Sequence, residues 1–532
     1  MTDDNAAAVA EICGRLDGMP LAIELAAARV RALSLAEILE GLRDRFRLLT
    51  GGARTAVPRQ QTLRASVDWS HALLSEPERV VFRRLAVFLG GFGLDGAQAV
   101  AGGADMPRFE VLDALALLVD KSLVVTDSTG GATRYRLLET VRQYAAEKLG
   151  ESGEADAVRS RHRDHYAALA AVLDAPAGND YEQRVEQAEA EIDNLRAAYA
   201  WSLETGDVEP ALALASSLQP LWLGRGRIRE GLAWLDAALA DLDAQHLEVA
   251  PAVRARALAD NASLATWARA TDNVDQAQQA LAIAREVDDP ALLARALTAC
   301  GFTAASNAEV AGPYFAEAIG LARALGDRWR LGQILVWWAT GALVAGDLVA
   351  ARVAAEEGRY LADAIGDRFN SRQCRVFLGC AQLYQGDLAG AAAQFGEVIA
   401  EAEAAHDEIS RVSRLASKGW ALAYQGDTTA ARAAADAAIE TAGDLGGAAS
   451  GFCYSALATA ALAAGDAGAA AHASAEDWQH LSVPGSAAHS LALYAQAALA
   501  GRDLIAARRG ADDAASTATG WHLMVALTTR AR

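Results

Sequence analysis

Four Gly-Asp pairs recur along the second half of this sequence at almost constant spacing. They are Gly346-Asp347, Gly386-Asp387, Gly426-Asp427 and Gly465-Asp466, which lie 40, 40 and 39 residues apart. Self-similarity at this period is typical of a helical solenoid, in which neighbouring repeats bury each other's apolar faces. The period therefore predicts a recognition scaffold in this half of the chain rather than a catalytic domain.

A second acidic series runs between the Gly-Asp pairs, at Asp327, Asp367, Asp407 and Asp444. It divides each repeat into two halves, and we expect one helix in each half. Glycine can adopt the left-handed conformation that ends a helix. An aspartate directly after it can accept hydrogen bonds from the first backbone N–H groups of the next helix.

Small and large residues alternate between the two helices of each repeat. Ala351, Ala391 and Ala431 stand four residues after the Asp of a Gly-Asp pair, and the preceding helices carry bulky side chains such as Trp337 and Trp420. This arrangement resembles the tetratricopeptide (TPR) class in a longer form of about 40 residues. Aromatic stripes usually form cores, so we expect most of these rings to be packed.

The segment before the repeats predicts a winged helix. Helices are expected at 61–74, from Ser75, at 95–101 and at 108–120, and short strands at 122–126 and 133–138. Glycines between the two strands favour a hairpin. A last helix at 139–149 completes the unit.

Several stretches resemble one family. Residues 13–28, CGRLDGMPLAIELAAA, resemble the GLPL element of signal-transduction NTPases of the NB-ARC type, and residues 61–70 and 134–145 resemble their winged helix. Residues 191–201 and 222–239 resemble the helical linker of large bacterial LuxR-type regulators of the MalT-like and AfsR-like group. The chain is thus similar to the C-terminal part of a STAND transcriptional regulator.

This resemblance implies a mainly α fold in four parts. They are a GLPL-containing helical remnant at 1–50, a winged helix with a small β-hairpin at 51–150, a helical linker at 151–250 and a solenoid of TPR-like repeats at 251–532.

The sequence departs from the family at both ends. It contains no G-x-x-x-x-G-K-[S/T] loop to hold a triphosphate, and no DNA-reading helix-turn-helix follows the repeats. We therefore expect a truncated or split regulator that is not an enzyme and has no cofactor of its own, whereas the full-length family binds ADP or ATP. Pro20 takes the place of the family proline next to the adenine, so it is nucleotide-proximal only if the missing domain is supplied.

The leading functional hypothesis is a regulatory sensor that binds an effector or a partner protein through its solenoid. Alternatives are a stand-alone TPR-like adaptor or the remnant of a broken gene. A winged-helix DNA-binding protein is the weakest candidate, because the expected reading helix carries Arg108 but also Glu110, Asp113 and Asp120. DNA would be contacted only through a domain missing here, and oligomerisation stays open.

The first helix of each repeat is expected to line the concave surface of the solenoid. These helices carry a row of basic and aromatic residues that suits an anionic or peptide ligand, because arginine offers forked donors. The row consists of Arg330, Gln333, Trp337, Arg368, Arg372, Arg375, Arg411 and Arg414. The alternative is that these arginines pair with carboxylates on adjacent helices.

The net charge and the cysteines indicate which partners and which cellular location suit the chain. The net charge of −20 is concentrated after residue 150, which disfavours a nucleic-acid surface on the solenoid. Five isolated cysteines and the lack of a long apolar run favour a reduced, cytoplasmic location without a membrane span. His162 and His165 are one helical turn apart, but no third ligand is near in sequence, so we expect a solvated helical face and no metal.

Overall fold

The computed structural model describes residues 3–16, 20–30, 33–42, 63–103, 106–127, 133–268, 273–305, 307–404, 407–444, 450–479 and 487–517. The chain divides into two compact units. The first contains Met1–Leu169 and Ala190–Asp207, and the second contains Ala170–Glu189 and Val208–Arg532.

Three short helices begin the first unit: α1 (Asp3–Arg15), α2 (Pro20–Arg29) and α3 (Leu35–Gly41). Pro20 is the first residue of α2, where its fixed φ suits the helix and the N–H that it lacks would have had no acceptor within the helix. Ser34 begins α3 with a capping box, in which Glu37 accepts the Ser34 N–H at 2.8 Å. Residues 43–62 lie outside the described part of the chain.

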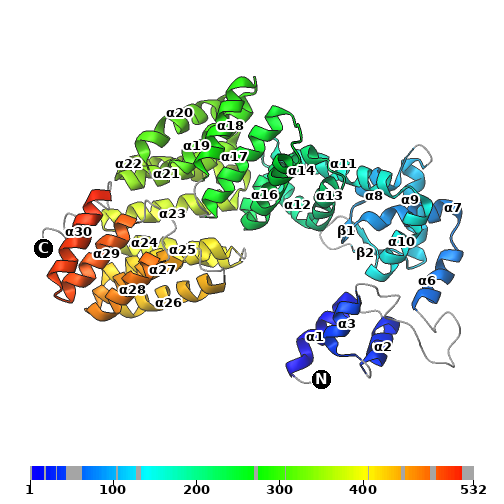
Figure 1. Ribbon diagram of the computed structural model, residues 1–532, viewed down its shortest axis with the longest axis horizontal. Coiled ribbons are helices and arrows are strands. Elements are labelled where there is room, and N and C mark those ends of the chain that lie inside the picture. The colour runs from blue at the N-terminus through cyan, green and yellow to red at the C-terminus, as the bar shows by residue number, and fades with distance from the viewer. Residues whose placement is uncertain are drawn as a thin grey trace. The chain divides into compact units, whose positions relative to one another are not determined.

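The winged helix follows, and its expected helices are confirmed (Figure 1). The elements are α6 (Leu63–Ala72), α7 (Glu76–Arg84), the 3₁₀ turn η2 (Leu85–Val87), β1 (Gly91–Phe92), α8 (Leu94–Ala101), α9 (Arg108–Asp120), β2 (Val125–Asp127), β3 (Arg134–Arg136) and α10 (Glu139–Ser152). The strands form an antiparallel sheet in the order β1-β3-β2. Phe92 pairs with Tyr135 and Val125 with Arg136.

Two details of the sheet differ from expectation. β1 was not predicted, because two residues give no periodic signal. β2 begins three residues later than expected, because the backbone N–H groups of Leu123 and Val124 still donate to Leu118 at the end of α9. Ser122 adopts a positive φ of 58°, which separates this helical turn from the strand.

Six helices precede the repeats. They are α11 (Ala155–Asp174), α12 (Tyr181–Ala190), α13 (Ile192–Glu204), α14 (Val208–Ser217), α15 (Gln219–Gly224) and α16 (Ile228–Ala244). α13 belongs to the first unit, whereas α12, α14, α15 and α16 belong to the second. The expected linker at 151–250 is therefore shared between the two units.

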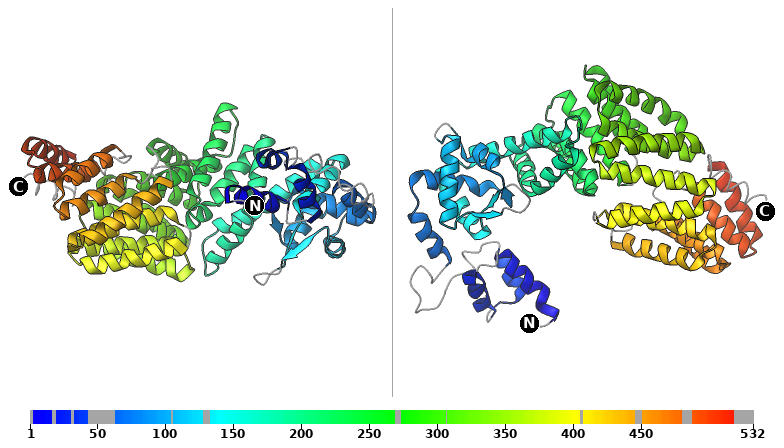
Figure 2. Two further views of the ribbon diagram at one scale, coloured as in Figure 1. Left: turned by 90° about the horizontal axis from the view of Figure 1, so that it is seen from below. Right: turned by 180° about the vertical axis from the view of Figure 1, so that it is seen from behind.

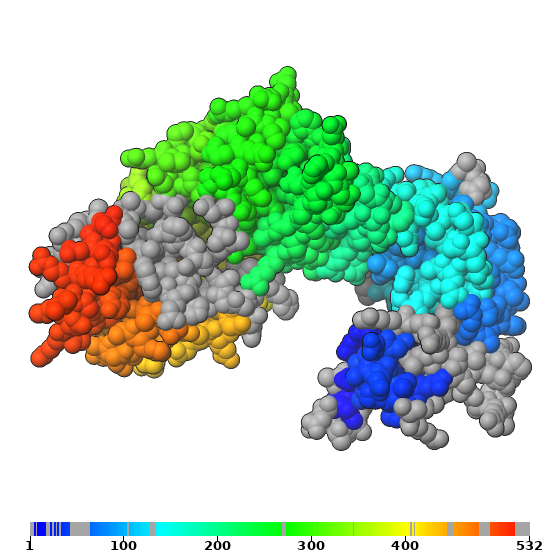
Figure 3. All heavy atoms as spheres, in the orientation of Figure 1, coloured from blue at the N-terminus to red at the C-terminus, as the bar shows by residue number. Residues whose placement is uncertain are grey.

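The repeats form a solenoid of antiparallel helix pairs. Its helices are α17 (Pro251–Trp267), α18 (Val274–Glu286), α19 (Pro290–Thr303), α20 (Ala308–Leu325), α21 (Arg328–Ala345), α22 (Leu348–Ile365), α23 (Arg368–Gln385), α24 (Leu388–Ala404), α25 (Glu408–Gln425), α26 (Thr428–Asp444), α27 (Ser450–Ala463), α28 (Ala467–Gln479), α29 (Ala487–Ala500) and α30 (Leu504–Thr517). Figure 2 shows this stack from two further directions, with α28 to α30 in orange and red. In the space-filling view, α17 to α20, in green, form a continuous packed surface (Figure 3).

The Gly-Asp pairs act as the sequence predicts. Gly346, Gly386, Gly426 and Gly465 all have φ between 75° and 89°, which is the left-handed region. Each following aspartate accepts the backbone N–H three residues later, at 2.9–3.1 Å. Asp327, Asp367 and Asp407 cap their helices in the same way. Asp444 is the last residue of α26, and the residues that follow it lie outside the described part of the chain, so a cap by Asp444 stays a prediction.

Small residues let the helices of a pair approach closely. Ala351, Ala391 and Ala431 are fully buried. Gly379 lies against Phe395, whose ring carbon would be 2.8 Å from a Cβ at this position. Such close packing explains the alternation of small and bulky residues along the repeats.

The first repeats wind tightly around a shared aromatic centre. The Trp267 ring, on α17, lies 4.9 Å from Trp337 on α21 and 5.2 Å from Phe369 on α23, measured between centroids. Tyr181 of α12 stacks on Trp329 of α21 at 6.3 Å. Helices that are not neighbours in the stack therefore meet on its inner side.

Candidate functional site

Most of the expected basic row is neutralised by carboxylates. Arg372 forms a buried ion pair with Asp407 at 3.1 Å, Arg375 binds Glu401 at 2.7 Å through Nη1, and Arg411 binds Glu408 at 3.0 Å. The hypothesis of a free anion-binding row is wrong for these three arginines, because each has a carboxylate within reach: at the start of α25 for Arg372, on α24 for Arg375 and on its own helix for Arg411. Arg414 also has an interaction partner, and Arg368 is exposed at the start of α23.

Arg330 and Trp337 occupy a different environment, on the inner side of α21. The Arg330 side chain is 6% exposed, and its Nε lies 3.6 Å from Asp327. Its guanidinium lies over the Trp329 ring at 5.5 Å. Trp337 packs edge to face against Trp267, with Phe302 at 4.8 Å.

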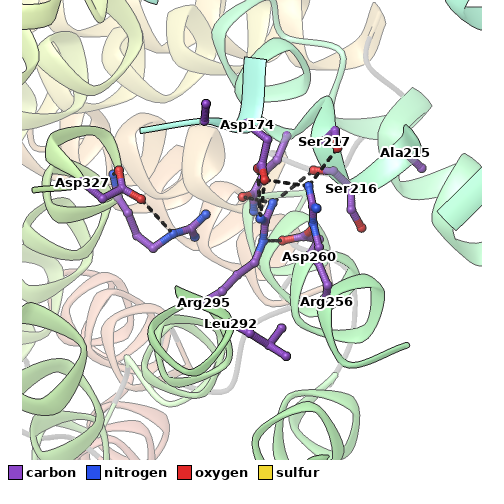
Figure 4. A network of polar contacts seen from close by, with 12 residues as sticks. Asp174, Ala215, Ser216, Ser217, Arg256, Asp260, Leu292, Arg295 and Asp327 are labelled. Carbon is purple, nitrogen blue, oxygen red and sulfur yellow. Dashed lines mark hydrogen bonds and ion pairs between the residues drawn. The ribbon is translucent and has the colours of Figure 1, made fainter. Parts of the chain in front are cut away.

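A buried cluster of arginines and aspartates lies in the same unit (Figure 4). Arg295 of α19 is at its centre and is 6% exposed. It donates to Asp260 of α17 at 2.6 Å through Nε and to Asp174 of α11 at 2.9 Å through Nη1. Its Nη2 donates to the Ser216 carbonyl at 3.1 Å. Asp174 also binds Arg256 at 2.7 Å.

The aspartates offset the cost of burying the positive charge at Arg295, but not at Arg256 and Arg330. Burial opposes the charge of Arg295, but Asp174 and Asp260 outweigh it and raise the pKa of this guanidinium. At Arg256 and Arg330, burial and the neighbouring charge of Arg295 lower the pKa in spite of the aspartates. A further anion close to Arg256 and Arg330 would therefore be stabilised.

Several buried polar atoms of this region have no hydrogen-bond partner among the described residues. Both amide atoms of Gln333 are unpaired, and so are Oδ2 of Asp260 and the indole Nε1 atoms of Trp267 and Trp337. Buried polar side-chain atoms are usually paired. Four side chains with unpaired atoms thus lie on α17 and α21, and this region is the candidate site, although other described helices contain unpaired buried atoms as well.

Sequence reasoning missed most of this cluster. Its members come from α11, α17 and α19, and Asp174 and Arg295 are 121 residues apart in sequence. Arg295 does stand six residues after the capping Asp289, as Gln333, Gln373 and Ser413 stand six after their own caps. This shared position was the signal that could have identified Arg295.

The first unit has its own buried polar centre. The Glu191 carboxylate accepts from Arg134 at 2.5 Å, Tyr166 at 2.8 Å and Asn194 at 2.8 Å. Asn194 also donates to the Gly91 carbonyl of β1 at 2.8 Å. The side chains thus connect the small sheet to α11 and α13.

His162 lies in this centre, so the expectation of a solvated face is wrong. It is 2% exposed, and its Nε2 is 3.5 Å from the Asn194 side-chain oxygen. Burial lowers the pKa of His162 to about 4, so the ring is neutral at ordinary pH. The part of the chain that the structure describes contains no cluster of three metal-ligating side chains.

α9 presents an apolar and acidic outer face. Phe109 is 66% exposed, Leu112 41% and Leu117 46%. Asp113 and Asp120 are exposed on the same helix. This composition does not suit contacts with phosphates or base edges, which need cationic and amide donors.

The fold defines a winged helix followed by an α-solenoid, and the winged helix has a family match. Residues 74–150 match the model of the winged helix-turn-helix domain. The match begins just before α7 and ends within α10, so it covers α7, α8, α9, most of α10 and the three strands.

Curated relatives match all or part of the chain. It is 57% identical over 538 aligned positions to "Putative HTH-type transcriptional regulator Rv0890c" of Mycobacterium tuberculosis H37Rv, covering 100% of this chain and 61% of that protein. It is also 61% identical over 163 positions to "Uncharacterized protein Rv0894" of the same strain, covering 30% of this chain and 42% of that protein. The chain thus spans about three fifths of the length of the longer relative.

Solved structures with a similar arrangement have little sequence identity to this chain. The STAND protein with a tetratricopeptide repeat sensor PH0952 from Pyrococcus horikoshii aligns with 95% of the chain and 73% of its own length, at 13% identity and a TM-score of 0.48. A Rap protein complexed with competence and sporulation factor aligns with 71% of the chain and 99% of its own length, at 12% identity and a TM-score of 0.49.

Within the described ranges, no helix combines the length and the apolar character that a membrane crossing needs.

Proposed function

We propose that this chain is the sensing portion of a bacterial LuxR-type STAND transcriptional regulator. Its solenoid binds an effector or a partner protein, and its winged helix passes the resulting change to the rest of the regulator. Such switching needs two states whose balance the ligand shifts. The chain acts in the cytoplasm, and DNA is read by another domain.

The observation that carries this proposal is the identity of 57% along the whole chain to a protein named as an HTH-type transcriptional regulator. The domain order supports it, because a winged helix precedes the solenoid as in the resembled family. The acidic and apolar face of α9 supports a lever role for the winged helix.

Transcript sequencing tests the regulatory role. The coding region is deleted in the host and restored with the wild-type gene. We expect a defined set of transcripts to change and to return on restoration. A deletion that changes no transcript beyond those altered by an unrelated deletion contradicts the proposal.

We further propose that the chain is not an enzyme and needs no nucleotide. The sequence has no phosphate-binding Gly-Lys loop, and Leu138 stands where related proteins carry a histidine that contacts ADP. Isothermal titration with ATP and ADP should show no binding in the micromolar range. Micromolar affinity for either nucleotide would refute this part.

A stand-alone adaptor is the second candidate, and the exposed apolar face of α9 favours it. Side chains such as Phe109 and Leu117 suit a protein partner. In that case the deletion would leave transcripts unchanged. The change Phe109→Glu would instead remove a partner that copurifies with the wild-type chain.

A further inference from the structure

α22 carries an exposed apolar stripe. Val349, Val353 and Tyr360 are 65%, 54% and 74% exposed. On a helix with 3.6 residues per turn, these three side chains project within about 40° of one another. Apolar side chains that gather in this way on a surface are typical of a contact with another protein.

The packing of the repeats does not require this stripe. Small or polar residues stand at the equivalent positions of the three following repeats, counted from the Asp of each Gly-Asp pair. They are Ala389, Thr429 and Gly468 for Val349, Ala393, Ala433 and His472 for Val353, and Ala400, Glu440 and Gln479 for Tyr360. Those repeats stack without large apolar side chains at these positions, so the stripe on α22 suits a contact outside the solenoid.

Four charged residues lie along one flank of the stripe, and their side chains are roughly half exposed. They are Arg352, Glu356, Arg359 and Asp363. Within the helix, Arg352 lies 3.8 Å from Glu356 and Arg359 lies 3.7 Å from Asp363. In both pairs the arginine comes first, which is the weaker order on a helix. Asp363 accepts from Ser371 through Oδ1, and its Oδ2 is the atom near Arg359. These long ion pairs can therefore exchange for pairs with another molecule.

The order of the four charges is self-complementary. About their common midpoint, Arg352 mirrors Asp363 and Glu356 mirrors Arg359, and the signs are opposite in both cases. In an antiparallel pair of helices related by a two-fold axis, the same flank of each helix faces that of the other. A second copy of α22 would thus bring Arg352 beside the partner's Asp363 and Glu356 beside the partner's Arg359.

The neutrality of this flank also favours a second copy as the occupant. The chain has a net charge of −20, so most contacts between two copies would bring negative charges together. The flank carries two positive and two negative residues and avoids this repulsion. A basic partner would be attracted to the acidic surface instead and would gain nothing from the two arginines.

We propose that α22 is a self-association surface through which two copies of this chain form an antiparallel dimer. The Tyr360 ring packs against the partner's Val353, and the ion pairs on the flank fix the register. One helix face is smaller than the interfaces of roughly 1,200 Å² and more that stable complexes bury, so the dimer dissociates readily. The proposal goes beyond the regulatory function and does not depend on it.

Sedimentation velocity of the full chain tests the dimer. We expect reversible association at concentrations on the order of 10–100 µM, and weaker association at high salt because the ion pairs are exposed. Tyr360→Ser should weaken it about tenfold, because the central apolar contact is lost. Tyr424→Ser removes an exposed tyrosine of α25 and should leave it unchanged. A chain that stays monomeric throughout this range at low salt overturns the proposal, and so does wild-type association of Tyr360→Ser.

Two charge reversals test the register. Glu356→Arg brings arginines together across the dimer, and Arg359→Glu brings glutamates together, so each variant alone should associate at least about tenfold more weakly. In an equal mixture, every arginine again faces a carboxylate, and association should return to about the wild-type level. Recovery in the mixture also shows that both variants are folded. Wild-type association of either variant alone, or no recovery in the mixture, contradicts the antiparallel arrangement.

The two proposals can fail separately. If the chain stays monomeric but the transcripts respond to the deletion, the α22 surface is wrong and the regulatory function stands. If the two variants lose association alone and recover it together but no transcript responds, the surface stands and the regulatory function is wrong.

Discussion

The two buried polar centres of this molecule differ in how completely their groups are paired. In the first unit, the Glu191 carboxylate receives three hydrogen bonds, and the Asn194 amide uses both its oxygen and its nitrogen. In the second unit, Arg295 is fully engaged, but among the described residues the Asp260 Oδ2 and the Gln333 amide have no hydrogen-bond partner.

The difference separates a structural centre from a candidate site. A polar network with every member paired makes the local structure more rigid, and it leaves no group for a ligand. A network that retains unpaired buried groups loses stability, and proteins keep such features mainly where they serve function. The same kinds of side chain thus stabilise the fold where all their polar atoms are paired, and mark a candidate site where some of these atoms are unpaired.

The largest expected effect is that of Arg295→Met. The change leaves Asp260, which is 0% exposed, without its ion-pair partner. Breaking a buried ion pair from one side costs about 3–5 kcal/mol. Urea unfolding should show this loss. Arg323→Met, which breaks the exposed pair with Glu357, should cost less than about 1 kcal/mol. Equal losses for the two variants would contradict the structural importance of the cluster.

Asp367→Asn should stabilise the second unit by an amount that depends on pH. Burial raises the pKa of Asp367 from 3.8 to about 6, although the carboxylate accepts hydrogen bonds from Asn370. The folded protein therefore binds this proton more tightly than the unfolded chain, and stability falls as the pH rises from about 4 to about 6. Asparagine can still cap α23. We expect the variant to gain of order 2 kcal/mol at pH 7 and little at pH 4.

In the first unit, Glu154 should give the opposite dependence of stability on pH and serves as a control. Burial opposes the charge of Glu154, but Arg83 and Arg84 outweigh it and lower its pKa. Glu154 therefore stabilises the fold above its unfolded pKa, and this stability is lost as the pH falls. Glu154→Gln should cost stability at pH 7 and less at pH 4. Curves for the two variants that run in parallel from pH 4 to pH 7 would disprove the contrast.

Glu191→Gln should weaken the first unit by about 1–2 kcal/mol, because the amide keeps one acceptor oxygen and its NH2 group replaces the other oxygen, where it faces a donor. Hydrogen exchange should report the loss at Leu89, whose N–H donates to Asn194 at 2.9 Å. Glu204→Gln affects only an exposed pair with Arg159 and serves as the control. Unchanged protection at Leu89 would mean that the network does not hold β1.

Gly386→Val should have the smallest effect, about 1 kcal/mol or more. No atom lies within 4 Å of the Cβ that would be added, so the cost arises from the backbone alone, at φ 89°. Gly386→Asn should be milder, because asparagine enters the left-handed region more readily. Equal stability of the valine variant and the wild type in thermal unfolding would contradict the assignment of this residue as a helix end.

Local signals made most of the fold predictable. Capping aspartates and left-handed glycines act within a few residues, so the Gly-Asp pairs specified helix ends correctly. α26 ends at Asp444, as the spacing of the acidic series predicts. β1 could not be predicted, since Gly91 and Phe92 are held by pairing with β3 and not by their own sequence pattern.

The site was less predictable, because side-chain pairing between helices decides it. Arg375 and Arg330 stand on equivalent types of helix in the sequence. In the structure, Arg375 binds Glu401 at 2.7 Å, whereas Arg330 is buried and its Nε lies 3.6 Å from Asp327. His162 looked solvent-exposed because its helix is rich in charge. It is buried against the rings of Phe88 and Tyr166, and Phe88 is 74 residues away in sequence.

The contacts of Trp267 with both α21 and α23 have a consequence for how the solenoid unfolds. Repeat arrays usually behave as one-dimensional chains in which each unit interacts only with its neighbours and can fray from an end. The Trp267 ring, on α17, contacts α21 and α23, which belong to the second and third helix pairs after its own. These contacts connect the pairs into one cooperative block. Under mechanical load or partial denaturation, we expect the repeats from α25 onwards to detach singly, while α17 to α23 melt together.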